Sequence, residues 1–249
     1  MAIIWKKVIK DRCYEVRMAG NSLRLYTNGT FHSQYNSRSP LNGSLWDLLV
    51  LPALFRPKNI KRVLVLGLGG GAVVRQILDL VDRPNIIAVE LDPTHVYIAN
   101  KYFSLARMNE VEIVTADAIA WLKHYKGKPF DLIVDDLFVE NGNDPFRAVE
   151  VDDAWSALLV KNLTKNGTVV VNFESTRAMN MSAFLKSSGL EGKIKSGFSF
   201  STPGYANKIA AFFRQVNDKA LLNETLKSFE EKRGRRFTRK INAIIKKII

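Results

Sequence analysis

The sequence has little cysteine, few histidines and no long apolar run, and each shortage excludes a class of protein. Cys13 stands alone, which excludes an internal disulfide framework and a cysteine-based metal cluster. The three histidines, at positions 32, 95 and 124, show no metal-ligand spacing, so we predict no metal. No apolar run approaches the length of a membrane span, and the first residues lack the order of a signal peptide. We therefore expect a protein of the reducing cytoplasm.

Two common catalytic motifs and a balanced charge are also missing. The chain contains neither a Gly-x-Ser-x-Gly elbow nor a phosphate-binding loop that ends in Lys-Ser or Lys-Thr. It has 37 Lys and Arg residues against 24 Asp and Glu residues, a net charge of +13. This excess favours anionic partners over cationic ones. The other interpretation is that the excess serves solubility or is concentrated in one tail.

Alternating strand and helix patterns occupy residues 58–216. Strands are expected at 63–66, 86–89, 111–114, 132–134 and 168–172, and the helices between them at 72–80, 93–103, 118–124 and 154–163. This alternation is typical of an α/β fold with a doubly wound, mostly parallel sheet. Two further strands, at 197–201 and 208–213, are joined by a short loop, so we expect the final strand to be antiparallel.

The two ends of the chain follow other patterns. Residues 1–57 predict a small N-terminal β-hairpin subdomain with a linking helix, because Asn28-Gly29 is a strong hairpin signal. Residues 217–249 predict a basic helical tail whose polar side carries lysine and arginine. Such a tail could bind nucleic acid or a membrane surface, or it could dock on the protein itself or on a partner subunit. Its apolar face comprises Phe237, Ile241, Ile244, Ile245 and Ile248.

The most informative stretch is a glycine-rich turn after the strand at 63–66. Glycines at 67, 69, 70 and 71 allow a sharp turn and the close approach of a ligand. The helix that follows points its amide N–H groups at that ligand. Glu90 ends the next strand, where a carboxylate can accept hydrogen bonds from ribose hydroxyls. The stretch therefore predicts a nucleoside-containing ligand, without fixing the reaction.

Acidic residues after the third and fourth strands narrow the ligand further. The spacing Gly67-x-Gly69-x-x-Ala72 also fits a nicotinamide dinucleotide site. However, Asp117 is placed to accept from an adenine amino group, and Asp135-Asp136 lies at the sheet edge where such folds bind ligands. We therefore favour an adenosyl sulfonium, and keep NAD as a distant alternative.

Six motifs carry a resemblance to a known family: Leu25-Tyr-Thr-Asn-Gly29, Pro52-Ala-Leu54, residues 63–76, Val89-Glu-Leu-Asp92, Ala116-Asp-Ala118 and residues 130–136. With them, the chain resembles the spermidine synthase-like S-adenosylmethionine-dependent transferases from about residue 23 to 214. The resemblance implies a Rossmann-like methyltransferase fold, S-adenosylmethionine or its decarboxylated form as cofactor, and a homodimer. The expected cofactor contacts are Gly67, Gly69, Gly70, Gly71, Glu90, Leu91, Asp117, Ala118 and Asp135.

The chain also departs from that family at positions that handle the amine. Spermidine synthases resemble Gly-Gly-Gly-Asp-Gly-Gly at the loop, and their aspartate, which contacts the amino group of the donor, is Gly70 here. Where those enzymes have Tyr-His-Glu, this chain has Leu45-Trp46-Asp47. Val139 stands in place of the second aspartate of their gate loop, and His32 in place of a conserved glutamine. A net charge of +13 also repels a polycation at long range.

We therefore predict a methyltransferase that uses S-adenosylmethionine and acts on a small molecule, with an anionic acceptor favoured by the charge. Alignment of the acceptor supplies most of methyl transfer. Asp136 is the first candidate base, unless it is a helix cap or a nucleoside contact, and His32 is the second, unless it only packs. Tyr205 and Asn207 are candidates for the wall of the acceptor pocket or for a plain turn. The alternatives are an aminopropyltransferase that makes polyamines and a non-catalytic nucleoside-binding module.

Overall fold

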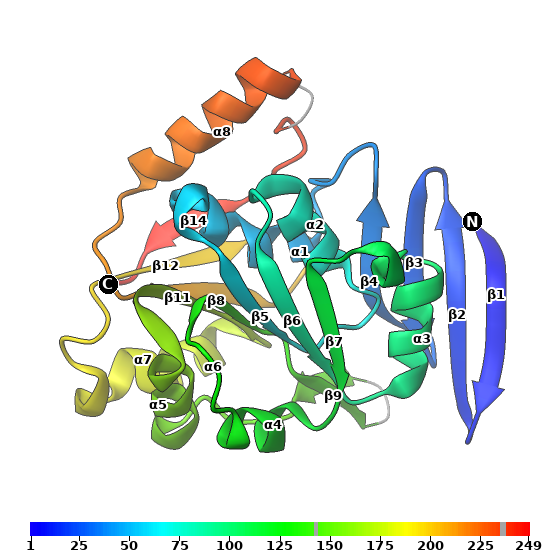
Figure 1. Ribbon diagram of the computed structural model, residues 1–249, viewed down its shortest axis with the longest axis horizontal. Helices are drawn as coiled ribbons and strands as arrows, with labels where there is room; N and C mark the ends of the chain where they lie inside the picture. The colour runs from blue at the N-terminus through cyan, green and yellow to red at the C-terminus, as the bar shows by residue number, and fades with distance from the viewer. Residues whose placement is uncertain (142–143, 235–237) are drawn as a thin grey trace.

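The predicted alternation forms an eight-stranded sheet in the order β14-β12-β13-β11-β8-β5-β6-β7 (Figure 1). The computed structural model describes residues 1–141, 144–234 and 238–249. Strands β11, β8, β5, β6 and β7 run parallel, whereas β13 lies antiparallel between β11 and β12, and β14 is antiparallel to β12. The predicted doubly wound, mostly parallel fold is confirmed. The strands are β5 (Arg62–Leu66), β6 (Asn85–Glu90), β7 (Val111–Thr115), β8 (Phe130–Asp135), β11 (Leu163–Phe173), β12 (Ser196–Ser201), β13 (Lys208–Phe213) and β14 (Ile244–Lys247).

Helices cover both faces of this sheet because its inner strands are apolar on both sides. Val63 and Val65 of β5 pack with α1 and α2, whereas Leu64 and Leu66 pack in a second core with α4 and α5. Within the described residues, no helix is both long and apolar enough to cross a membrane. The helices are α1 (Leu45–Val50), α2 (Ala72–Leu80), α3 (Pro93–Lys101), α4 (Ala118–His124), α5 (Asp153–Lys161), α6 (Thr176–Met181), α7 (Ala183–Lys186) and α8 (Lys219–Arg233), with 3-10 turns η1 (Leu51–Phe55), η2 (Pro57–Asn59), η3 (Leu105–Arg107) and η4 (Ser188–Leu190).

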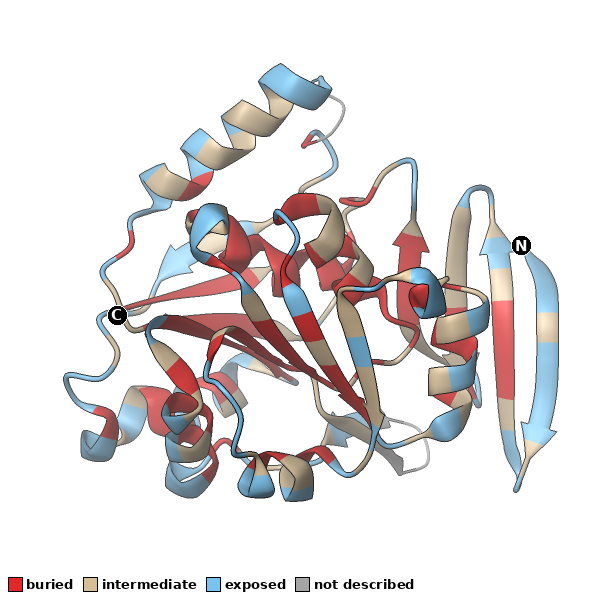
Figure 2. Ribbon diagram, viewed as in Figure 1, coloured by how far each residue is buried: buried red, intermediate tan, exposed pale blue. Residues whose placement is uncertain are grey.

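The N-terminal residues form a four-stranded antiparallel sheet, in which β3 and β4 are the predicted hairpin. Asn28 (φ 48°) and Gly29 (φ 85°) make the expected tight turn between β3 and β4. The inner strands of this sheet bury part of their surface, whereas β1 is mostly exposed (Figure 2). The sheet lies beside α3 and the edge of the central sheet (Figure 1). Its strands are β1 (Ala2–Ile9), β2 (Arg12–Ala19), β3 (Ser22–Thr27) and β4 (Thr30–Asn36).

A buried carboxylate fixes the start of α1. One oxygen of Asp47 accepts the backbone N–H groups of Asn42 (2.8 Å) and Gly43 (2.7 Å). The other accepts the side-chain amide of Gln76 (2.7 Å) on α2 and the hydroxyl of Ser44 (3.4 Å). Burial raises the pKa of Asp47 to about 6, although these donors favour its ionised form. The carboxylate thus ties α1 to α2, which begins at the glycine-rich turn.

The C-terminal tail is helical only in its first part. Helix α8 is followed by β14, a strand that pairs with β12 at the edge of the central sheet. The prediction of one helical tail over residues 217–249 is therefore wrong at its end. Isoleucine is β-branched and suits a strand, and β12 offers an open edge for pairing, which outweighs a helical hydrophobic period. Phe237, which we placed on the apolar helix face, lies outside the described residues.

We expect the Asp47→Ala variant to lose about 2–3 kcal/mol of unfolding free energy, because it leaves several buried donors without their acceptor. Urea denaturation followed by circular dichroism measures this loss. Asp82→Ala, at an exposed aspartate, is the control and should change stability by less than about 0.5 kcal/mol. Equal losses in the two variants would refute the structural role of Asp47.

Candidate active site

The loop between β5 and α2 turns through left-handed glycines. Gly67 (φ 87°), Gly69 (φ 52°) and Gly71 (φ 86°) all adopt backbone angles that other residues avoid. A Cβ atom on Gly67 would also overlap the backbone carbonyl oxygen of Asp136, which follows the neighbouring strand β8. Position 67 therefore requires glycine for its conformation and for the space available. The same closeness brings the loop directly against Asp136.

Glu90, at the end of β6, holds this loop in place. Its Oε2 atom accepts the backbone N–H groups of Leu68 (3.0 Å) and Gly69 (2.8 Å). Its Oε1 atom accepts the backbone N–H of Asp92 (2.9 Å). A carboxylate offers about four acceptor positions, so a ligand hydroxyl can still be accommodated.

A cavity of about 1000 Å³ opens where these segments meet, at the carboxyl edge of the parallel strands. The N-terminal sheet supplies part of its wall through β2 and β4, and the loop between β12 and β13 supplies another part through Tyr205 and Asn207. A cavity of this size accommodates a nucleoside and a second small molecule together. The predicted site residues that line it are His32, Gly67, Gly69, Glu90, Leu91, Asp117, Ala118 and Asp136.

One end of the cavity carries acids that also anchor helices. Asp117 accepts the backbone N–H of Ala120 (2.7 Å) and caps α4. Asp92 caps α3 through Thr94 (2.7 Å) and accepts the hydroxyl of Tyr14 (2.7 Å) from the N-terminal sheet. Burial alone would raise the pKa of Asp92, but the Tyr14 hydrogen bond and other donors lower it overall. These acids are therefore already oriented before any ligand arrives.

Asp136 lines the cavity and is held by two side-chain amides in series. Asn172 on β11 donates to its Oδ1 atom (2.7 Å), and Asn207 donates to Asn172 (3.0 Å). The carboxyl keeps part of its surface open to the cavity, while protein surrounds it on its other sides. Burial raises its pKa to about 6, although the Asn172 hydrogen bond acts in the opposite direction. A carboxyl that titrates near neutrality is well matched to accepting a proton.

Asp135, which we expected to contact the cofactor, is turned away from the cavity. Its side chain is fully buried and accepts hydrogen bonds from Arg147 (2.7 Å) and from the Trp155 indole of α5 (2.9 Å). Successive side chains of a strand point to opposite faces, so Asp135 follows Ile133 into the core beneath α5. The structure therefore assigns Asp135 to an internal ion pair and leaves Asp136 to the cavity.

Gly70 and Gly71 do not line the cavity either. A Cβ atom on Gly70 would lie 2.8 Å from the Phe103 ring and 2.9 Å from the Ser33 Cβ atom, and one on Gly71 would overlap Leu105 closely. An aspartate at position 70, as the resemblance expects, would thus require its buried neighbours to move. The packing explains why this position accepts no larger side chain.

The structure adds residues that the sequence did not single out. His95 on α3 shares a hydrogen bond with the Thr27 hydroxyl through its Nε2 atom (2.8 Å). Its Nδ1 atom lies 3.8 Å from Oε1 of Glu90. Its ring centroid lies 5.0 Å from the ring centroid of His32. Asn172 lies at the carboxyl end of β11, a place in the strand pattern that could have marked it. Nothing in the sequence pattern links His95 to Glu90. Within the described residues, no group of three or more side chains is placed to hold a metal.

Comparison with known proteins places this geometry in context. A family model described as the spermine/spermidine synthase domain matches residues 47–224. The polyamine aminopropyltransferase 2 of Caldanaerobacter subterraneus subsp. tengcongensis is 30% identical over 168 residues, which cover 67% of this chain and 55% of that protein. The chain spans about half or less of the length of such relatives.

Two solved structures share the fold. A probable spermidine synthase from Corynebacterium glutamicum superposes with a TM-score of 0.71 at 17% identity, covering 99% of this chain and 91% of that one. A spermidine synthase in complex with the transition-state analogue AdoDATO gives a TM-score of 0.61 at 16% identity, covering 95% and 78%. At these identities the likeness concerns the fold alone.

We expect Gly67→Ala to be more destabilising than Gly29→Ala, although both positions have almost the same φ. A Cβ atom at Gly29 meets open space, so this variant pays only for its backbone conformation, about 1 kcal/mol. The same atom at Gly67 meets Asp136 and adds about 1–3 kcal/mol. Thermal denaturation of the two variants measures the difference. Equal melting temperatures would contradict the close packing of the loop against Asp136.

Proposed function

The chain belongs to the spermine/spermidine synthase family, and from that premise we propose that it is an aminopropyltransferase that uses decarboxylated S-adenosylmethionine. The observation that carries the proposal is the Asp136 carboxyl, which faces the cavity directly beside the glycine loop. The name of the Caldanaerobacter relative supports the same reaction. This proposal reverses the order of our two predicted transfers, and methyl transfer becomes the second candidate.

In the proposed complex, the adenosine of the donor lies along the acids at the ends of β6 and β7. Glu90 accepts one ribose hydroxyl with its remaining acceptor capacity, and Asp117 faces the adenine. The sulfonium then lies over Gly67 and Gly69, where the absence of side chains permits close approach. Asp136 is thereby the carboxyl nearest to the reacting centre.

The proposed reaction is a displacement at the carbon next to sulfur. The acceptor nitrogen forms a bond to the aminopropyl carbon while the bond from that carbon to sulfur breaks and 5′-methylthioadenosine leaves. The nitrogen gives up one proton, and the Asp136 carboxylate accepts it. Asn172 and Asn207 keep that carboxylate in position. Alignment of nitrogen, carbon and sulfur supplies most of the acceleration.

The wall around Asp136 suits a cationic amine as acceptor. Asp136 and Glu174 both line the cavity, and Phe31, Trp46 and Tyr205 contribute aromatic side chains to it. Carboxylates and aromatic faces attract ammonium groups at short range. The repulsion from a net charge of +13 is screened beyond about 8–10 Å at physiological salt. Local acids can therefore outweigh the distant positive charge.

Methyl transfer remains the second candidate because of one observation at the loop. Gly70 stands where an aspartate would hold the amino group of the donor, and the contacts with Phe103 and Ser33 exclude that aspartate. A donor that does not rely on this contact, such as S-adenosylmethionine itself, is compatible with the same loop. Donor identity is therefore the feature that separates the two candidates.

Product analysis tests the two candidates directly. The chain is incubated with putrescine and either decarboxylated S-adenosylmethionine or S-adenosylmethionine, and the nucleoside product is identified by mass spectrometry. We expect 5′-methylthioadenosine and an aminopropylated amine from the decarboxylated donor. S-adenosylhomocysteine formed only from the other donor, with any acceptor, would replace the proposal by methyl transfer. If calorimetry shows that neither donor binds, both candidate reactions are contradicted.

We expect the rate of the wild type to fall as the pH drops through about 6, because protonated Asp136 cannot accept a proton. Asp136→Asn should lower kcat by about 10²–10⁴-fold and remove this acidic limb. Glu174→Gln removes a carboxylate from the same cavity and serves as the control, since it should keep the limb. An unchanged acidic limb in Asp136→Asn would contradict its role as proton acceptor.

The same variant should be more stable than the wild type at neutral pH. The pKa of Asp136 is raised from 3.8 to about 6 on folding, so its ionised form is disfavoured in the folded state. This cost is complete above about pH 6 and disappears below about pH 4. We expect Asp136→Asn to gain about 3 kcal/mol at pH 7.5, and the gain to vanish below about pH 4. Denaturation at both pH values measures it, and a gain that does not depend on pH would refute this explanation.

A further inference from the structure

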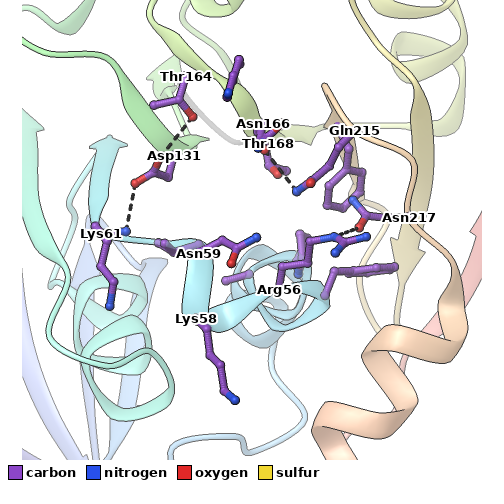
Figure 3. A pocket seen from close by; sticks show the side chains of 16 residues that line it. Arg56, Lys58, Asn59, Lys61, Asp131, Thr164, Asn166, Thr168, Gln215 and Asn217 are labelled. Carbon is purple, nitrogen blue, oxygen red and sulfur yellow. Dashed lines mark hydrogen bonds between the residues drawn. The ribbon is translucent and has the colours of Figure 1, made fainter.

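A second cavity lies where the parallel strands begin, at the opposite end of these strands from the proposed active site (Figure 3). It has a volume of about 470 Å³ and is formed by η2, by the first residues of β8 and β11, and by the segment after β13. Strand β5 starts beside it, next to Lys61, and ends at the glycine loop. The full length of the strands therefore separates this cavity from the proposed active site.

The charge on the walls of this cavity is mainly positive. Arg56, Lys58, Lys61 and Lys165 line it, against one acid, Asp131. Within the part of the chain that the structure describes, no hydrogen bond or ion pair engages the three lysine ammonium groups. A cavity with several uncompensated cations attracts an anion.

The one carboxylate in the wall of this cavity, Asp131, accepts hydrogen bonds from the starts of two strands. One oxygen of Asp131 accepts the backbone N–H groups of Lys61 (2.9 Å) and Arg62 (3.0 Å), and the other accepts the Thr164 hydroxyl (3.1 Å). Figure 3 shows Thr164 and Lys61 reaching Asp131 from two sides. Asp131 therefore joins the starts of β5, β8 and β11, and among the described residues no ion pair links it to the lysine ammonium groups.

The buried side-chain amide of Asn217 is a second indication that this cavity binds a ligand. Asn217 is 4% exposed, and its Oδ1 atom accepts the Arg56 guanidinium (2.9 Å; Figure 3). Its Nδ2 atom is buried and has no acceptor among the described residues. Buried donors in native proteins are almost always paired, so an unpaired one at a cavity wall indicates an acceptor that the protein chain itself does not provide.

We propose that this cavity binds a small molecule that carries a phosphate-type oxyanion. The cations supply charge, Asn217 and Arg56 supply directed donors, and the side chains of Phe55 and Phe213 form an apolar part of the wall. A phosphate presents several acceptor oxygens to such a set. The concave shape and limited volume favour one small molecule over a nucleic acid strand. The proposal does not depend on the reaction at the other edge of the sheet.

Pyrophosphate is the probe for this site. Its binding to the full chain is measured by calorimetry and thermal shift, with sodium chloride matching the ionic strength in the reference. 5′-Methylthioadenosine is present throughout to occupy the proposed donor pocket. We expect saturable binding and a rise in melting temperature beyond that given by chloride. Stabilisation equal to that given by chloride would overturn the proposal.

Two variants locate the bound anion. Lys58→Ala combined with Lys165→Ala should weaken pyrophosphate binding at least about tenfold. Lys123→Ala combined with Lys126→Ala removes the same charge at exposed sites outside this cavity and should leave the affinity within about twofold. Equal losses in both pairs, or a preference for a single-stranded oligonucleotide that both pairs weaken equally, would show general electrostatic attraction and overturn the proposal.

The buried amide is tested by a substitution of the same shape. Asn217→Asp keeps an acceptor for Arg56 and replaces the unpaired donor by a carboxylate oxygen. With folding verified by circular dichroism, we expect this variant to lose pyrophosphate binding at least about tenfold, because like charges repel. Retained affinity in a folded Asn217→Asp protein would contradict the assigned contact.

Discussion

The close approach of Gly67 to the backbone carbonyl of Asp136 is the constraint on which the site depends. Strands β5 and β8 are neighbours in the sheet, and Leu66 lies opposite Asp135. The residues that follow, Gly67 and Asp136, therefore come into contact. Only glycine fits this place, and the loop therefore turns away at once toward α2. One carboxyl is thereby placed beside a backbone that a sulfonium can approach. The Glu90 hydrogen bonds to Leu68 and Gly69 hold the loop in this position.

Side chains of mainly opposite charge surround the two ends of the parallel strands. Acids follow the carboxyl ends of the strands around the large cavity, whereas lysines and an arginine surround the smaller cavity where the strands begin. The net charge of +13 is thus compatible with a cationic acceptor, because the acids lie close to the proposed site of reaction. It also identifies the other edge as the surface where an anion is expected. The net charge alone favoured an anionic substrate because it sums the charges around both cavities and the rest of the chain.

Regular hydrophobic periods made the central fold predictable, and the failures occur where position in space decides. Asp135 and Asp136 are equivalent as a pair in sequence, and only the alternation along β8 sends one into the core and the other into the cavity. The isoleucines of β14 fit a helical period as well as a strand, and the open edge of β12 settles the choice. Asn172 and His95 lie far from the glycine loop in sequence, so that only the folded chain shows what they contact.

The central claim is that the glycine loop, Glu90 and Asp136 form one donor site. A crystal structure of the chain with 5′-methylthioadenosine tests it most directly. The account predicts ribose hydroxyls within hydrogen-bonding distance of Glu90, adenine beside Asp117, and the sulfur atom over Gly67 on the side of Asp136. Electron density for the nucleoside outside this cavity, or with its sulfur directed away from Asp136, would contradict the claim.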